Sequence, residues 1–192
     1  MENITAAKEK FGALIEAQKK RVAAMRAQGD FVDYAALPQI VIGVCGGDGI
    51  GPTITHEAER VLRFLLKDEV EKGKVAFKES DGLPIENRAA HMKAIPDDVL
   101  AELKACHVIL KGPTTTPRAG DEWPNIESAN VAMRKELDLF ANVRPVKVPE
   151  EGIDWTFFRE NTEGAYTLGS CGFETEDGIS VDFTITTTDG TQ

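Results

Sequence analysis

The stretch that decides the fold runs from Ile40 to Pro52 and reads IVIGVCGGDGIGP. Its first five residues form an apolar, largely β-branched run, which predicts a strand that is buried on both faces. The glycines that follow predict a tight turn, and Pro52 suits the first position of a helix. Apolar residues then recur on one face of that helix, at positions 54, 58, 61, 62 and 65.

The same alternation continues towards the C-terminus. Val75 to Phe77 predicts a second short strand, and His107 to Leu110 predicts a third. Between them, the acids of Ile95-Pro96-Asp97-Asp98 favour the start of another helix. Strands that alternate with helices in this way predict an α/β domain with a largely parallel sheet.

The two ends of the chain have different patterns. Near the N-terminus, apolar residues at helical spacing predict an amphipathic helix that stops at Gly29-Asp30. Its apolar stripe is short and lacks Trp, so we expect it to pack against the body of the protein or a partner chain rather than a membrane. Phe140 to Val148, Trp155 to Phe158 and Ile179 to Thr188 predict strands.

Composition excludes several classes of protein. The net charge of −10 and the pI of about 4.9 argue against a nucleic-acid partner, because such a surface repels phosphates. No apolar stretch is long enough for a membrane span, and the N-terminus lacks the apolar core of a signal peptide. Cys45, Cys106 and Cys171 have no metal or redox spacing, which predicts reduced thiols in a cytoplasmic protein and no metal ligands among them.

The glycine turn invites comparison with the fingerprint of dinucleotide-binding sites. Gly47, Gly49 and Gly51 have GxGxG spacing, and Pro52 takes the place of the third fingerprint glycine. Glu79, the acid at the end of the second strand, is about 30 residues away, whereas the fingerprint places its acid about 20 residues on. The sequence therefore predicts a structural strand-to-helix turn rather than a Rossmann site.

Three arginines form a second candidate site. Arg134 lies on a helix that begins near Ser128, and Arg144 and Arg159 lie in predicted strands. Guanidinium groups that converge in a cleft bind carboxylates bidentately, so the three could clamp a multiply charged acid. Spacing alone does not separate this hypothesis from three ordinary surface arginines.

Five segments resemble, in order, the isocitrate/isopropylmalate dehydrogenase family: GDGIGP from Gly47, LKGPTTTP from Leu110, NVAMRKELDL from Asn130, ANVRP from Ala141 and RENTEGAY from Arg159. The resemblance implies that family's own α/β fold, which is not a Rossmann fold, in an N-terminal half that ends in a β-rich clasp. It divides the chain into a helical N-terminal extension (1–37), the N-terminal part of the large α/β domain (38–139), the start of the small domain (140–163) and clasp strands (164–192).

The resemblance also implies a chemistry, the oxidative decarboxylation of a 2-hydroxy acid with NAD or NADP and with Mg²⁺ or Mn²⁺. It assigns the substrate carboxylates to Ser128, Asn130, Arg134, Arg144 and Arg159, a proton-donating catalytic role to Tyr166, and cofactor contacts to Thr115, Thr116 and Asn130. Isocitrate is the expected substrate, because a buried Ser and Asn that faced an isopropyl group would lose about 1–3 kcal/mol each in unmade hydrogen bonds. Homoisocitrate and 3-isopropylmalate are the alternatives.

Members of this family are longer than 192 residues, and their catalytic lysine, metal-binding aspartates and adenosine-binding loop lie in the second half. We therefore expect this chain to be one subunit of a split dehydrogenase, in which a partner chain supplies that half and the metal ligands. Two alternatives to the split dehydrogenase remain. In the first, the chain is a non-catalytic regulatory or ligand-binding subunit. In the second, it is a truncated piece of a longer gene product.

Overall fold

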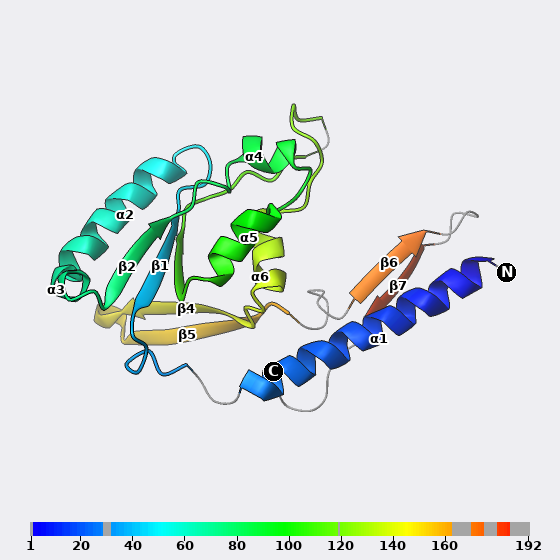
Figure 1. The fold of residues 1–192 in the computed structure, drawn as a ribbon, viewed down its shortest axis with the longest axis horizontal. Helices are drawn as coiled ribbons and strands as arrows, with labels where there is room; N and C mark the ends of the chain where they lie inside the picture. Colours follow the sequence, from blue (N-terminus) through cyan, green and yellow to red (C-terminus); the bar gives the residue numbers. More distant parts are fainter. Residues whose placement is uncertain (1, 29–31, 119, 163–169, 175–179, 185–192) are drawn as a thin grey trace. The chain divides into compact units, whose positions relative to one another are not determined.

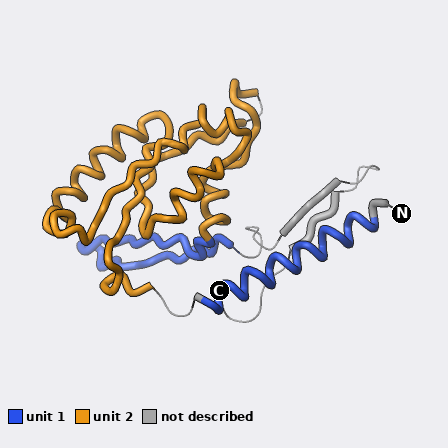
Figure 2. Tube along the Cα trace, viewed as in Figure 1, with its two compact units in different colours: residues 1–31, 138–192 blue, residues 32–137 orange. Residues whose placement is uncertain are grey.

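The computed structural model describes residues 2–28, 32–118, 120–162, 170–174 and 180–184 (Figure 1). The chain forms two compact units, one made of residues 1–31 and 138–192 and the other of residues 32–137 (Figure 2). Among the described residues, no helix is both long and apolar enough to cross a membrane.

The unit of residues 32–137 is built on a three-stranded parallel sheet. Its strands are β1 (Ile40–Cys45), β2 (Val75–Glu79) and β3 (Val108–Lys111), in the order β2-β1-β3. The helices are α2 (Gly51–Leu65), α3 (Lys67–Glu71), α4 (Ile85–Ala90), α5 (Asp97–Lys104) and α6 (Ala129–Glu136). The predicted α/β arrangement is confirmed. The short helix α4 was not predicted, because its six residues are too few to show a helical period.

Helices cover both faces of this sheet. The register pairs Ile42 with Phe77, so their side chains share one face, and Arg63 of α2 lies 4.3 Å from the centre of the Phe77 ring. Cys45 points to the other face and belongs to the main hydrophobic core. That core is formed by Cys45, Leu83, Ile95, Val99, Leu103, Ala129, Ala132 and Met133, and so includes both α5 and α6.

The apolar face of α2 is not the face that lies against the sheet. The buried residues of α2 are Gly51, Thr55 and Glu59, and Glu59 is neutralised by Arg63 at 2.5 Å. The side chains of Ile54, Val61 and Leu65, which the sequence places on an apolar face, are exposed. This inversion leaves a hydrophobic stripe open on the surface of the unit.

The other unit contains α1 (Glu2–Gln28) and two antiparallel strand pairs. β4 (Ala141–Val148) and β5 (Ile153–Glu160) form a hairpin through the short helix η1 (Pro149–Glu151) and Gly152, which has a φ of 68°. β6 (Ser170–Glu174) pairs with β7 (Ser180–Thr184), and α1 lies beside β6. α1 ends at Gln28, as the sequence predicts, and its Leu14 and Gln18 are buried.

Candidate functional site

Two loops meet where the parallel strands β1 and β3 end side by side. Gly47 has a φ of 73°, and a Cβ atom there would lie 2.0 Å from the carbonyl oxygen of Pro113. A Cβ on Gly112 would lie 2.0 Å from the carbonyl oxygen of Gly46. The glycines therefore allow two backbones to touch, which supports the prediction of a structural turn.

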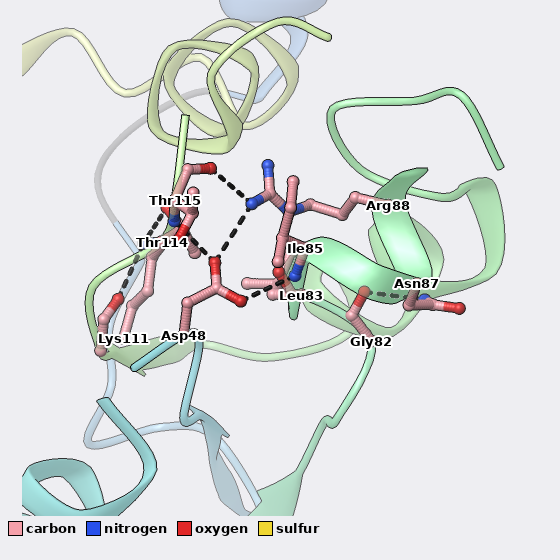
Figure 3. A network of polar contacts seen from close by, with 10 residues as sticks. Asp48, Gly82, Leu83, Ile85, Asn87, Arg88, Lys111, Thr114 and Thr115 are labelled. Carbon is pink, nitrogen blue, oxygen red and sulfur yellow. Dashed lines mark hydrogen bonds and ion pairs between the residues drawn. The ribbon is translucent and has the colours of Figure 1, made fainter. Parts of the chain in front are cut away.

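Asp48 anchors this junction. Its backbone N–H donates to the carbonyl oxygen of Pro113 at 2.8 Å. Its Oδ1 accepts a hydrogen bond from the N–H of Ile85 at 2.7 Å, and its Oδ2 accepts one from the N–H of Thr115 at 2.6 Å (Figure 3). One carboxylate thus joins the glycine turn, helix α4 and the threonine loop.

Arg88 of α4 completes the network and is fully buried. Its Nε donates to the carbonyl oxygen of Leu83 at 2.8 Å, and its Nη2 donates to the carbonyl oxygen of Thr115 at 2.6 Å and to Asp48 Oδ2 at 3.2 Å (Figure 3). Its Nη1 is buried without a hydrogen-bond partner among the described residues. A buried guanidinium is tolerated only when an opposite charge and hydrogen bonds compensate for its lost hydration, and Asp48 supplies the charge.

Lys111 holds the same loop from its other side. Its Nζ donates to the carbonyl oxygen of Gly112 at 2.8 Å and to Thr114 Oγ1 at 3.1 Å. Burial lowers the pKa of Lys111, and the charge of Arg88 acts in the same direction. The loop is therefore fixed through its backbone, while the side chains of Thr115 and Thr116 face solvent.

Helix α6 carries the next three predicted residues. Ala129, Ala132 and Met133 are buried in the core, which turns the opposite face of the helix outward. Asn130 and Arg134 are four residues apart and so lie on the same face of the helix, Asn130 exposed and Arg134 half-buried. Ser128 occupies the N-cap position, and its hydroxyl makes no capping hydrogen bond.

The remaining two arginines lie on one face of the β4–β5 hairpin. Asn142 is paired with Arg159, and Arg144 is two residues further along β4, so Arg144 and Arg159 are diagonal neighbours. Such neighbours are about 7–8 Å apart, which is within reach of two long side chains that bind one small molecule. Arg144 Nε donates to Asn142 Oδ1 at 2.9 Å, which aligns its guanidinium along this face.

The predicted site residues therefore belong to both units. Thr115, Thr116 and the three α6 residues lie in the unit of residues 32–137, whereas Arg144 and Arg159 lie in the other unit. Tyr166 lies outside the described residues. Sequence reasoning missed the Asp48–Arg88 pair. The available signal was an isolated acid inside a glycine turn, which needs a cation from elsewhere in the chain.

Among the described residues, no group of three or more His, Cys, Asp and Glu side chains could hold a metal ion. These residues therefore do not form a site for the Mg²⁺ or Mn²⁺ that the resemblance implies. The side chains of Thr115 and Thr116 are exposed on a loop that Asp48, Arg88 and Lys111 hold through its backbone.

Comparison with known proteins gives the family. Residues 41–189 match the model of the isocitrate/isopropylmalate dehydrogenase family. The chain belongs to this family. It is 38% identical to an NADP isocitrate dehydrogenase of Caldococcus noboribetus, over 66% of this chain and 30% of that protein. It is 35% identical to regulatory subunit 3 of the mitochondrial NAD isocitrate dehydrogenase of Arabidopsis thaliana, over 63% of this chain and 30% of that protein.

Solved structures agree with this family fold. A β-decarboxylating dehydrogenase of Thermococcus kodakarensis matches with a TM-score of 0.55 and 30% identity, over 78% of this chain and 41% of that one. The isocitrate dehydrogenase of Methylococcus capsulatus matches with a TM-score of 0.53 and 26% identity, over 78% of this chain and 43% of that one. The chain thus spans about a third of the length of the curated relatives it matches. Helix α1 precedes the residues that match the family.

Proposed function

We propose that this chain supplies the substrate-carboxylate clamp of an NAD(P)-dependent isocitrate dehydrogenase, which oxidatively decarboxylates isocitrate to 2-oxoglutarate. The observation that carries the proposal is the shared face of Arg144 and Arg159 on the β4–β5 hairpin. Two guanidinium groups on one face can bind two carboxylates of one acid. A protein with a net charge of −10 needs such a local cluster to attract a trianion.

Helix α6 carries the other residues that we propose for substrate binding. Arg134 and Asn130 share one face of the helix. The hydroxyl of Ser128 makes no capping hydrogen bond and could bind a further carboxylate. These polar groups favour isocitrate over 3-isopropylmalate, whose apolar branch would leave them without partners. Homoisocitrate, which also has a third carboxylate, remains the nearest alternative substrate.

The cofactor and the proton donor are also part of the proposal. The exposed side chains of Thr115 and Thr116 would contact the nicotinamide end of NAD or NADP, and Tyr166 would return a proton after CO₂ leaves. The named relatives include both NADP and NAD enzymes. The divalent metal would polarise the substrate, and the residues that bind the metal would lie outside the described residues.

A partner chain would supply those ligands and the catalytic lysine. The exposed apolar face of α2 supports the proposal of a partner chain, because such surfaces in soluble proteins are usually covered by another chain or segment. The face consists of Ile50, Ile54, Val61, Phe64 and Leu65. The free thiols of Cys45 and Cys106 support the cytoplasmic location that the sequence predicts.

A second candidate function is a non-catalytic subunit that binds isocitrate and regulates a partner. The similarity to a regulatory subunit in Arabidopsis favours it. The two functions differ in one measurement, which is isocitrate-dependent reduction of NAD(P) by the complex after Tyr166→Phe. A catalytic chain loses this activity, whereas a regulatory chain keeps it.

The first test concerns the clamp. Arg144→Gln and Arg159→Gln are each expected to weaken isocitrate binding by at least about tenfold, because each removes a charge-assisted pair of hydrogen bonds. Titration calorimetry with the chain, alone and with its partner, measures the dissociation constant. Lys147→Gln is the matched control, because Lys147 lies on the opposite face of β4 and pairs with Asp154 at 2.8 Å. Wild-type affinity in both arginine variants would show that the clamp is assigned to the wrong residues.

A further inference from the structure

Helix α1 makes a specific polar contact with the two segments that flank the β4–β5 hairpin, within the unit that carries Arg144 and Arg159. Arg21 Nε donates to Asp138 Oδ2 at 3.1 Å, and Arg21 Nη2 donates to Asp138 Oδ1 at 3.1 Å. Nη2 also lies 3.4 Å from Thr162 Oγ1, and Nη1 lies 3.4 Å from Gln18 Oε1. One guanidinium of α1 therefore contacts two segments that are far apart in the sequence.

These two segments continue the strands of the β4–β5 hairpin. Asp138 precedes β4, and Thr162 follows β5. One further hydrogen bond joins the two chain segments just beyond the strands: the N–H of Asn161 donates to the carbonyl oxygen of Phe140 at 2.8 Å. Arg21 thus lies across the open end of the hairpin, which is the end opposite the turn at Gly152.

The contact is partly shielded from water. The side chain of Arg21 is 12% exposed and that of Asp138 is 35% exposed, and Thr162 is fully buried. The hydroxyl of Thr162 donates to Glu160 Oε1 at 3.0 Å, and the backbone N–H of Thr162 donates to the same oxygen. A bidentate ion pair in such surroundings is stronger than an exposed one, because salt and water screen it less.

The location of the contact matters because the substrate arginines sit near the same open end. The last residue pair at the open end joins Ala141 and Glu160, and the next pair joins Asn142 and Arg159. Arg144 lies two residues after Asn142 on β4. A two-stranded hairpin is marginally stable by itself, and its open end separates most easily. Separation there would change the distance between the two guanidinium groups.

We propose that Arg21 is a positioning residue for the carboxylate clamp, and that α1 is therefore part of the substrate-binding unit. Arg21 joins Asp138 to Thr162, keeps the two strand ends together and so sets the spacing of Arg144 and Arg159. This inference rests on the proposed function of those two arginines. It assigns a role to a helix that lies outside the family match.

The experiment compares Arg21→Gln, Asp138→Asn and the double variant in the full chain. Asp138 has a φ of 49°, and Asn accepts this left-handed conformation, so Asp138→Asn removes the charge without disturbing the backbone. Lys20→Gln is the control, because Lys20 is an exposed neighbour on α1. Amide hydrogen exchange of Asn161 reports on the open end, and calorimetry reports the affinities for isocitrate and for the nicotinamide cofactor.

We expect each single variant to speed exchange at Asn161 and to weaken isocitrate binding about tenfold. The double variant should be no worse than Arg21→Gln alone, because Asp138 acts through its ion pair with Arg21. Cofactor affinity should not change, since Thr115 and Thr116 lie in the other unit. Arg21→Lys should restore part of the isocitrate affinity, because it keeps the charge.

Faster exchange with unchanged isocitrate affinity would overturn the inference, since Arg21 would then stabilise the hairpin without positioning the clamp. Equal losses of isocitrate and cofactor affinity would also overturn it, because they indicate general unfolding. If the wild-type chain binds no isocitrate, the proposed function itself fails and the positioning role fails with it. That outcome is recognised before any variant is compared.

Discussion

At the scale of single residues, buried charges hold the threonine loop in place. Asp48 and Arg88 form an ion pair inside the unit, and the side chains of Thr115 and Thr116 remain exposed on the loop that the pair holds. A loop fixed through its backbone does not have to be ordered when a cofactor binds, so less binding free energy is lost. The residues that prepare the site are thus different from those that would touch the ligand.

Asp48→Asn should lower the free energy of unfolding by about 3 kcal/mol, because it leaves the buried Arg88 without a counter-charge. Urea unfolding of the two proteins measures the difference. Asp97→Asn is the control, because the exposed Asp97 pairs with Lys93 on the surface and its loss should change stability by less than about 1 kcal/mol. If the two variants unfold alike, the buried pair contributes no more than a surface pair.

Cys45 should make stability fall at high pH. Burial raises the pKa of this thiol from 9.0 to about 11, and the neighbouring Cys106 acts in the same direction. Between these values the unfolded chain has lost a proton that the folded chain keeps, so rising pH favours unfolding. The contribution is fully present below about pH 9 and lost through pH 11.

The measurement compares the free energies of unfolding of the wild type and Cys45→Ala at about pH 8 and about pH 11. We expect the advantage of the wild type to shrink by about 2 kcal/mol over this range. Cys106→Ala should show a smaller change, since Cys106 is only partly buried. An advantage that stays constant with pH would mean that Cys45 ionises normally in the folded chain.

At the scale of elements, α2 and the β4–β5 hairpin both expose apolar side chains. In α2, small or neutralised polar residues face the sheet because Gly51 lies against the backbone of Gly46 and a Cβ on Gly112 would meet Thr55 Oγ1. Large side chains would not fit at positions 51 and 55, whereas further along the helix the buried Glu59 is paired with Arg63. In the hairpin, Trp155 and Phe157 lie edge to face at 6.2 Å and remain exposed.

At the scale of the whole molecule, the exposed apolar face of α2 is where the proposed partner would bind. Val61→Lys and Phe64→Lys should therefore prevent association with the partner chain while changing the free energy of unfolding of this chain by less than about 0.5 kcal/mol. Native mass spectrometry of the untagged protein from its source identifies the partner and then tests the variants. Arg60→Gln is the control, because Arg60 is an exposed polar neighbour paired with Glu57. A complex that survives both lysine variants would show that the partner binds elsewhere.

Much of this protein could be read from its sequence. The run from Ile40 to Pro52 predicted the first strand, the turn and the following helix, because period, glycine and proline act locally. The family followed from five short segments, and the family match confirms it. The substrate-binding roles of Arg134, Arg144 and Arg159 and the catalytic role of Tyr166 remain predictions.

Tertiary structure alone decided three other features. It turned the apolar face of α2 outward, because the close approach of two glycine loops left space only for the small residues Gly51 and Thr55 at the start of the helix. It paired Asp48 with Arg88, and it placed Arg21 across the strand ends at Asp138. In each of these pairs the two residues lie far apart in the chain. Local sequence patterns cannot predict which distant residues will meet.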